Sequence, residues 1–181
     1  MILEVFKNLI NSRKDVNILF EKEKLMDDLN MNEKITKALK FYNNAISLKE
    51  KIRSGWLQWN IESERIESVA EHIYGTIMLA ISLHSELYND ENLDIDKVIK
   101  MLAIHEIEEI KIGDITPFDN ITDEEKRKIG KIAVSEICNV LELGNDYIDV
   151  IEEFEKVETK EAKFARMCDK LEANLQSKKY D

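Results

Sequence analysis

The sequence has few residues that break helices, and this scarcity indicates the fold class. Its 181 residues include one proline and five glycines, whereas leucine, isoleucine, glutamate and lysine are abundant. Proline and glycine disfavour helix interiors, and the abundant residues are mostly compatible with long helices. We therefore predict an all-α protein. Hydrophobic residues make up 44% of the chain, which is enough for one domain with a buried core.

Cysteine, long hydrophobic runs and positive charge are also scarce. Cys138 and Cys168 stand alone without CxxC spacing, and nothing reads as a signal peptide or a membrane span, so we expect a cytoplasmic protein with reduced thiols. Lys and Arg number 26 against 37 Asp and Glu, for a net charge of −11. Nonspecific phosphate binding needs a field of Lys and Arg, so we expect neither a nucleic acid polymer nor an anionic membrane as partner.

Hydrophobic periodicity divides the chain into an extension and a domain. Residues 1–50 carry apolar residues at helical spacing and show no chemistry, so we predict a helical extension packed on the domain or on a second subunit. Residues 51–181 form the domain. Its first part, 51–67, has the sequence KIRSGWLQWNIESERIE, which lacks a clean apolar stripe and is predicted to be a loop or broken helix.

Capping signals mark where the helices of the domain begin. Ser68 with Glu71 and Thr122 with Glu125 fit capping boxes, and Asp94 fits an N-cap. Together with the apolar spacing, these signals predict helices over about 69–88, 95–112, 123–143, 146–154 and 159–177. On the first of these, the residues expected to be buried are Val69, Ile73, Ile77, Ala80, Ile81 and Leu87.

The stretch from Leu102 to Asp119, LAIHEIEEIKIGDITPFD, places a histidine and three glutamates at a helix end. Glu109 is four residues after His105 and shares its helix face, while Glu106 lies about 100° around the helix. A metal ion between those directions could take His105 and Glu106, with Glu109 near a bound water. The alternative is a helix end with a solvated acidic face, to which Glu108 belongs.

Two further residues are candidates because of where they lie. His72 is in the first turn of its helix, a position where a lone histidine is more often structural than a metal ligand. Asp169 lies among alanines on the inner row of the last helix, and a lone buried carboxylate there is unfavourable unless it is paired or binds a cation. Asp169 therefore needs a partner.

These residues, and the sequence motifs around them, resemble a known family. His72, the pair His105-Glu106 and Asp169 are similar to the H…HD…D pattern of the HD-domain metal-dependent phosphohydrolases. Short motifs around these residues resemble the 5'-deoxynucleotidase branch of that family. They are RSGW at 53–56, ESVAEH at 67–72, GDITP at 113–117 and EAKFARMCDKLE at 161–172. The resemblance covers residues 51–178, in order.

The resemblance implies an HD-domain helical bundle of roughly six or more helices, usually a homodimer, that holds one divalent metal ion. It implies hydrolysis of deoxyribonucleoside 5'-monophosphates to nucleoside and phosphate. The implied metal ligands are His72, His105, Glu106 and Asp169. Glu109 matches the catalytic glutamate that handles the proton of the attacking water. Asp114 and Trp56 match positions that favour deoxyribose, and Arg53 is the candidate phosphate contact.

The donor set has its own chemistry, and one member departs from the family pattern. Two imidazoles and two carboxylates favour Mn, Co, Fe or Ni over Mg alone. Glu106 stands where the family has aspartate, and its side chain is one methylene longer, so either the backbone or the metal must shift. Gly55 precedes Trp56 where some relatives have arginine. The alternatives are a phosphodiesterase or nucleoside-triphosphate hydrolase of this superfamily, or a catalytically impaired nucleotide-binding protein.

Overall fold

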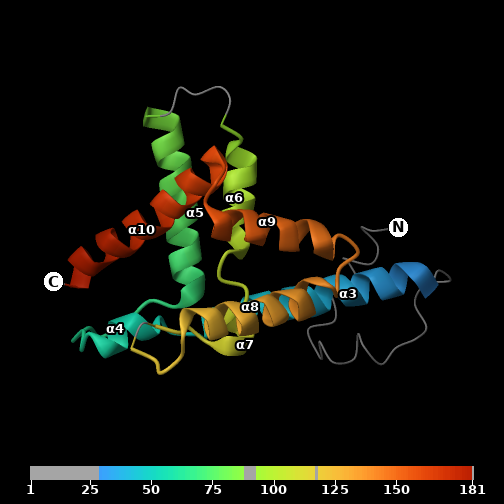
Figure 1. Cartoon of the computed structure of the whole chain (residues 1–181), viewed down its shortest axis with the longest axis horizontal. Helices are drawn as coiled ribbons and strands as arrows, with labels where there is room; N and C mark the ends of the chain where they lie inside the picture. The colour runs from blue at the N-terminus through green and yellow to red at the C-terminus, as the bar shows by residue number, and fades with distance from the viewer. Residues whose placement is uncertain (1–28, 88–92, 117, 181) are drawn as a thin grey trace, which may run out of the picture. The chain divides into compact units, whose positions relative to one another are not determined.

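The computed structural model describes residues 29–87, 93–116 and 118–180, and these residues confirm the all-α prediction. Within them, the β-type contact is an isolated antiparallel bridge between Ile52 and Ser68. The helices, shown in Figure 1, are α3 (Leu29–Ile46), α4 (Ser54–Gln58), α5 (Val69–Leu87), α6 (Ile95–Ile104), α7 (Glu109–Ile112), α8 (Asp123–Cys138), α9 (Gly144–Lys156) and α10 (Lys160–Tyr180), with a 3-10 turn η1 at Ser47–Lys49. None of these helices is both long and apolar enough to span a membrane.

The chain divides into two units, residues 1–39 and residues 40–181. In the first unit the structure describes residues 29–39, which are the beginning of α3. The earlier apolar residues of the predicted extension lie outside the described residues. An extension over residues 1–50 that packs on the domain therefore stays a prediction. The second unit contains every candidate site residue.

Side-chain caps begin three helices of this unit as predicted. The hydroxyl of Ser68 accepts a hydrogen bond from the backbone N–H of Glu71 at 3.3 Å, and the Glu71 carboxylate accepts from the Ser68 N–H at 2.8 Å. Thr122 and Glu125 form the same reciprocal pair at the start of α8, and Asp94 caps α6. Such caps satisfy N–H groups that have no partner within the helix.

Three helices enclose the main core. α5, α6 and α10 pack against one another, and α9 packs on α6, α8 and α10; Figure 1 shows α10 crossing α5. The main core lies between these helices and includes Met101, Leu102, Phe154 and Cys168, all nearly inaccessible to solvent. A smaller cluster between α7, α8 and α9 contains Ile107, Val134, Ile137, Cys138 and Ile151.

The helix predicted over residues 95–112 is wrong in its middle. α6 ends at Ile104, and a turn leads to α7, which begins at Glu109. The ring of His105 bonds through Nδ1 to the carbonyl oxygen of Leu102, at 2.8 Å, and this carbonyl would otherwise serve the α-helix ladder. The backbone hydrogen bonds that follow join residues three apart, as in a 3-10 helix. One of them runs from Glu109 N–H to Glu106 O at 3.1 Å.

The helix predicted over residues 123–143 ends earlier, at Cys138. Gly144, which directly follows the predicted range, is the first residue of α9. A Cβ atom on residue 144 would lie 2.3 Å from the carbonyl oxygen of Cys138. The glycine is therefore needed for a close approach between the end of α8 and the start of α9.

The predicted buried side of α5 is only partly correct. Val69 and Ala80 are buried as expected, but Ile81 and Leu87 are 41% and 72% exposed. The fully buried row instead includes His72 and Thr76. Hydrophobicity did not distinguish the two sides because α5 carries apolar residues all round, and long-range packing decides which side is covered.

We expect Gly144→Ala to lower the free energy of unfolding by about 1–3 kcal/mol, because the added methyl group overlaps the Cys138 carbonyl. Urea titration followed by circular dichroism measures this loss. Gly55→Ala is the matched control, since a Cβ atom there meets nothing within 4 Å. Equal stability of the Gly144 variant and the wild type would contradict the close-approach explanation.

Candidate metal centre

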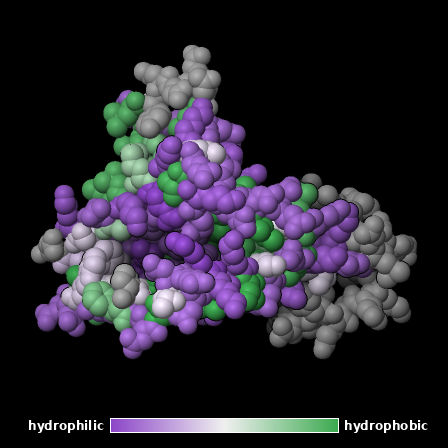
Figure 2. Space-filling view, viewed as in Figure 1, coloured by the Kyte–Doolittle hydropathy of each residue, from purple (hydrophilic) through white to green (hydrophobic). Residues whose placement is uncertain are grey.

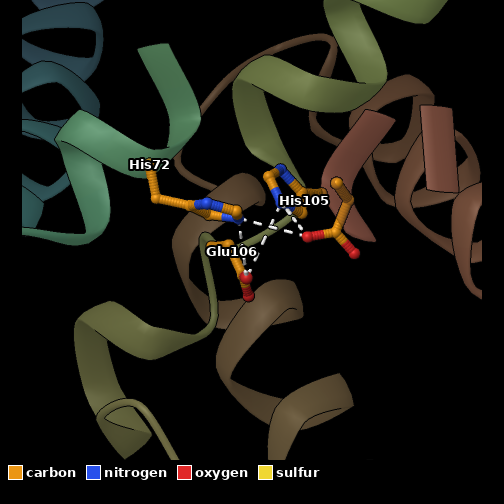
Figure 3. Close-up of side chains that lie close together, drawn as sticks. His72, His105 and Glu106 are labelled. Carbon is orange, nitrogen blue, oxygen red and sulfur yellow. Dashed lines mark hydrogen bonds and ion pairs between the residues drawn. The ribbon is translucent and has the colours of Figure 1, made fainter. Parts of the chain in front are cut away.

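Side chains from three elements meet at one point of the domain. They are His72 in the first turn of α5, His105 and Glu106 after the end of α6, and Asp169 in α10. One ligand atom from each lies within 4.8 Å of the others. Figure 3 shows the rings of His72 and His105 and the carboxylate of Glu106 turned toward the same small volume. The fold thus brings together all four residues that the sequence suggested as metal ligands.

The four distances between a histidine nitrogen and a carboxylate oxygen in this cluster are compatible with a single ion. Nε2 of His72 lies 3.1 Å from Oδ1 of Asp169 and 4.0 Å from Oε1 of Glu106. Nε2 of His105 lies 3.8 Å and 3.6 Å from the same two oxygens. Ligands that each lie about 2.1 Å from a metal ion cannot be more than about 4.2 Å apart. All four separations satisfy this limit.

His105 is already prepared as a ligand. Its Nδ1–H donates to the carbonyl of Leu102, which leaves the lone pair on Nε2. That Nε2 atom is buried and has no hydrogen-bond partner among the described residues. Burial lowers the pKa of His105, so the neutral ring is favoured. A buried nitrogen without a partner, facing two carboxylates, is the expected state of a ligand whose ion lies between them.

His72 is bound at both ring nitrogens. Its Nδ1 lies 2.6 Å from Oε2 of Glu172, and its Nε2 faces Asp169. Burial disfavours a charged ring, but the hydrogen bonds to Asp169 and Glu172 outweigh it and raise the pKa of His72 to about 9. The carboxylates of Asp169 and Glu172 therefore favour a positive charge on or beside the His72 ring. A metal ion on Nε2 would supply that charge while the ring stays neutral.

Asp169 has the partners that its position requires. It is 8% exposed, and Nη1 of Arg166 lies 3.5 Å from its Oδ2, so its Oδ1 faces the histidines. Burial alone would raise the pKa of Asp169, but the hydrogen bond with His72 and the neighbouring charges lower it. The prediction that Asp169 needs a partner is confirmed. Asp169 is therefore ionised and available to a cation.

Glu106, the residue that departs from the family pattern, points inward. Its Oε1 is the atom that approaches both imidazoles, and its side chain is 18% exposed. The guanidinium of Arg53 lies 3.2 Å from the same oxygen. Residue 106 lies in the tightened turn after α6 rather than in a continuous helix, and its carboxylate faces both imidazoles.

Glu108 and Glu109 are more buried than the acidic run in which they lie suggested. Glu109 is 4% exposed, and its backbone N–H donates to the carbonyl oxygen of Glu106. Burial, with the charges of Glu106 and Asp114, raises the pKa of Glu109 to about 10. The interpretation of Glu108 as part of a solvated face is wrong. Its Oε2 atom is buried, and burial followed by the charge of Glu106 raises its pKa to about 7. These surroundings favour the protonated form of Glu109.

The remaining candidates lie on α4 and on the turn after α7. Oδ2 of Asp114 accepts a hydrogen bond from the backbone N–H of Ser54 at 2.6 Å, which ties the turn to α4. Trp56 is 4% exposed, and its indole N–H donates to Glu67 at 2.8 Å. Of the candidate substrate contacts, Arg53 touches a proposed metal ligand.

Sequence reasoning gave no separate role to two residues that border the ligands. Arg166 and Glu172 lie three residues before and after Asp169 on α10, so all three share one helix face. The signal was present in the spacing R-x-x-D-x-x-E. It carries little information alone, because charged residues three apart are common on helices.

The comparisons with known proteins agree with this geometry. The HD domain family model matches residues 45–181. The chain is 37% identical over 148 residues to the 5'-deoxynucleotidase HDDC2 of Dictyostelium discoideum, a match that covers 79% of this chain and 77% of that relative. It is 32% identical over 145 residues to the 5'-deoxynucleotidase HDDC2 of Homo sapiens, covering 79% and 68% of the two chains.

Solved structures share the fold. A protein from Magnetospirillum magnetotacticum, described as a predicted metal-dependent phosphohydrolase, superposes with a TM-score of 0.67 at 28% identity, covering 81% of this chain and 71% of that one. The PH0347 protein from Pyrococcus horikoshii gives a TM-score of 0.66 at 26% identity, covering 81% and 78%. The chain therefore belongs to the HD-domain family of metal-dependent phosphohydrolases, and it groups there with relatives named as 5'-deoxynucleotidases.

Proposed function

We propose that this protein is a 5'-deoxynucleotidase, which hydrolyses deoxyribonucleoside 5'-monophosphates to nucleoside and phosphate with one divalent metal ion. The observation that carries the proposal is the set of four inward-facing donors, among which the buried Nε2 of His105 has no hydrogen-bond partner in the described chain. The naming of the relatives as 5'-deoxynucleotidases supports the substrate class.

The proposed ligands are the two imidazole Nε2 atoms of His72 and His105 and one carboxylate oxygen each from Glu106 and Asp169. When bound, a divalent ion would lower the pKa of a coordinated water and neutralise charge on the phosphate. Mn, Co, Fe or Ni suits this mixed nitrogen and oxygen set better than Mg does.

Glu109 is the proposed catalytic residue, because it is a buried carboxyl group three residues after the proposed ligand Glu106. Its Oε2 has no partner among the described residues, so this oxygen is free to exchange a proton with the attacking water or the leaving oxygen. Burial also excludes bulk water from the proton it holds. Its contact with Glu106 places that exchange beside the ligands.

Arg53, Asp114 and Trp56 are the proposed substrate contacts. The Arg53 side chain is 17% exposed, and a guanidinium can bind two phosphate oxygens at once. Asp114 is fixed by the Ser54 N–H at the start of α4, the same helix that carries Trp56. We propose that this rigid pair limits the room beside the sugar and so favours deoxyribose over ribose.

The exposed face of α5 supports the proposal that two copies associate. Between Glu71 and Glu86 the helix has no Asp, Glu, Lys or Arg, and Tyr74, Met78 and Ile81 are 67%, 42% and 41% exposed. Figure 2 shows hydrophobic side chains gathered over the C-terminal half of α5. In a protein with a net charge of −11, two copies repel least where they meet through an uncharged strip. We also propose a cytoplasmic location, which the two free, buried cysteines support.

The proposed reaction predicts metal-dependent phosphate release that disappears in Glu109→Gln. The expected loss is about 100-fold or more, because positioned acid–base groups contribute roughly that much, and metal binding should persist. Release is measured with deoxyribo- and ribonucleoside 5'-monophosphates, a 5'-triphosphate and a cyclic nucleotide, after metal removal and after supply of Mn, Co or Mg. Turnover undiminished in chelator, or a preference for the triphosphate or the cyclic nucleotide, would overturn the proposal.

The proposed ligand set predicts that His105→Ala lowers metal affinity by more than about 100-fold, since even changes to groups outside the ligands cost up to that factor. Isothermal titration with Mn or Co measures the dissociation constant. His84→Ala is the control, because His84 is a partly exposed histidine on α5 outside the cluster. The ligand assignment fails if both variants bind metal as the wild type does.

The proposed association predicts that the double variant Met78→Glu/Ile81→Glu is monomeric, because it places two carboxylates in the apolar strip on each copy. Light scattering coupled to size-exclusion chromatography gives the mass in solution. Ile132→Glu is the control, since Ile132 is 51% exposed on α8. A dimer that survives in the double variant would place the interface elsewhere, and a monomeric wild type would exclude the dimer.

A further inference from the structure

A carboxylate outside the four proposed ligands holds the ring of His72. Glu172 is 9% exposed, and its Oε2 lies 2.6 Å from Nδ1 of His72. Asp169, three residues earlier on the same helix, lies 3.1 Å from the other ring nitrogen, Nε2. One face of α10 therefore contacts both nitrogens of a single imidazole from α5, and this two-sided contact fixes the rotation of the ring.

A glycine on α5 leaves room for the side chain of Glu172. Gly75 lies one turn after His72 on α5, and a Cβ atom on it would be 2.5 Å from Oε1 of Glu172 and 3.0 Å from its Cδ and Cγ. A glycine inside a helix is about 1 kcal/mol less favourable than alanine. The contact explains why α5 has glycine there, since any larger residue would collide with the Glu172 carboxylate.

The short contact between His72 and Glu172 is a hydrogen bond rather than a second cation site. Glu67, His72 and Glu172 also place their ligand atoms within 4.8 Å of one another. Two ligands at right angles on one ion are about 3.0 Å apart, which is longer than the 2.6 Å between Nδ1 and Oε2. Glu67, moreover, already accepts the indole N–H of Trp56.

We propose that Glu172 is a positioning residue for His72, and that Gly75 provides the space for it. By accepting the Nδ1–H, Glu172 selects the tautomer whose lone pair is on Nε2 and turns that atom toward Glu106 and Asp169. This inference rests on the proposed metal ligand set. It adds to that set a pair of residues that touch neither the ion nor the substrate.

The experiment compares metal binding by Glu172→Gln and Gly75→Ala with that of the wild type. A glutamine replaces the anionic acceptor of the His72 Nδ1–H with a weaker, neutral amide, and the alanine displaces the carboxylate. Both variants should raise the dissociation constant for Mn or Co about 10–100-fold, the usual effect of changing such a partner of a metal ligand. Either variant alone keeps the test valid if the other fails to fold, which circular dichroism reports.

Glu161→Gln is the matched control. Glu161 lies on α10 and is 8% exposed, and it accepts a hydrogen bond from the Asp94 N–H instead of contacting the cluster. It should change stability and leave the dissociation constant within about twofold. The visible spectrum of the Co-loaded protein gives a second readout. It should change in Glu172→Gln, because the imidazole donor is altered, and stay the same in Glu161→Gln.

The outcomes separate this inference from the proposed function. Wild-type affinity and an unchanged Co spectrum in both Glu172→Gln and Gly75→Ala, with binding lost in His105→Ala, would overturn the role of Glu172 and leave the metal site intact. A wild-type protein that binds no metal would overturn the proposed function itself. Weakened binding confined to Glu172→Gln and Gly75→Ala, with Glu161→Gln unaffected, would establish the positioning role.

Discussion

The contact between α10 and the ring of His72 is the interaction on which the site depends. A fully buried imidazole lies between two carboxylates of one helix, and those carboxylates are themselves almost inaccessible to water. Buried charges of one sign are unfavourable unless a cation accompanies them. The packing of α5 on α10 thus creates a local demand for positive charge, and a divalent ion shared with His105 and Glu106 would satisfy it. Metal binding at this site would therefore be linked to the packing of α5 on α10.

The turn after α6 carries the glutamate that stands where the family pattern has aspartate. In this turn the Nδ1–H of His105 donates to the carbonyl of Leu102, and the backbone tightens into hydrogen bonds between residues three apart. Oε1 of Glu106 lies 3.6 Å from Nε2 of His105. The hydrogen bond that prepares His105 as a ligand is therefore part of the same turn that presents Glu106.

The sequence predicted the parts of this structure that depend on local chemistry. The caps at Ser68, Asp94 and Thr122 were correct because a cap is satisfied within four residues. The interruption after Ile104 and the role of Gly144 were missed because each depends on a contact that periodicity does not encode, a side chain on a carbonyl and one helix end on another. Helix spacing and burial pointed to His105, Glu106 and Asp169, the resemblance completed the ligand set with His72, and only the fold shows that the four face one another. Glu172 was missed because its partner, His72, lies 100 residues away.

The negative charge of the protein explains why a phosphate substrate needs both the metal ion and the guanidinium of Arg53 at this site. The chain carries a net charge of −11, and two of its carboxylates, those of Glu106 and Asp169, lie in the cluster itself. A phosphate dianion is repelled by such a surface unless positive charge is concentrated at one point. Arg53 contacts Glu106, so its guanidinium lies beside the place where the ion would bind. A phosphate group bound there would meet the guanidinium and the ion together. The same ion that would balance the buried carboxylates would thus offset the repulsion between the protein and its phosphate substrate.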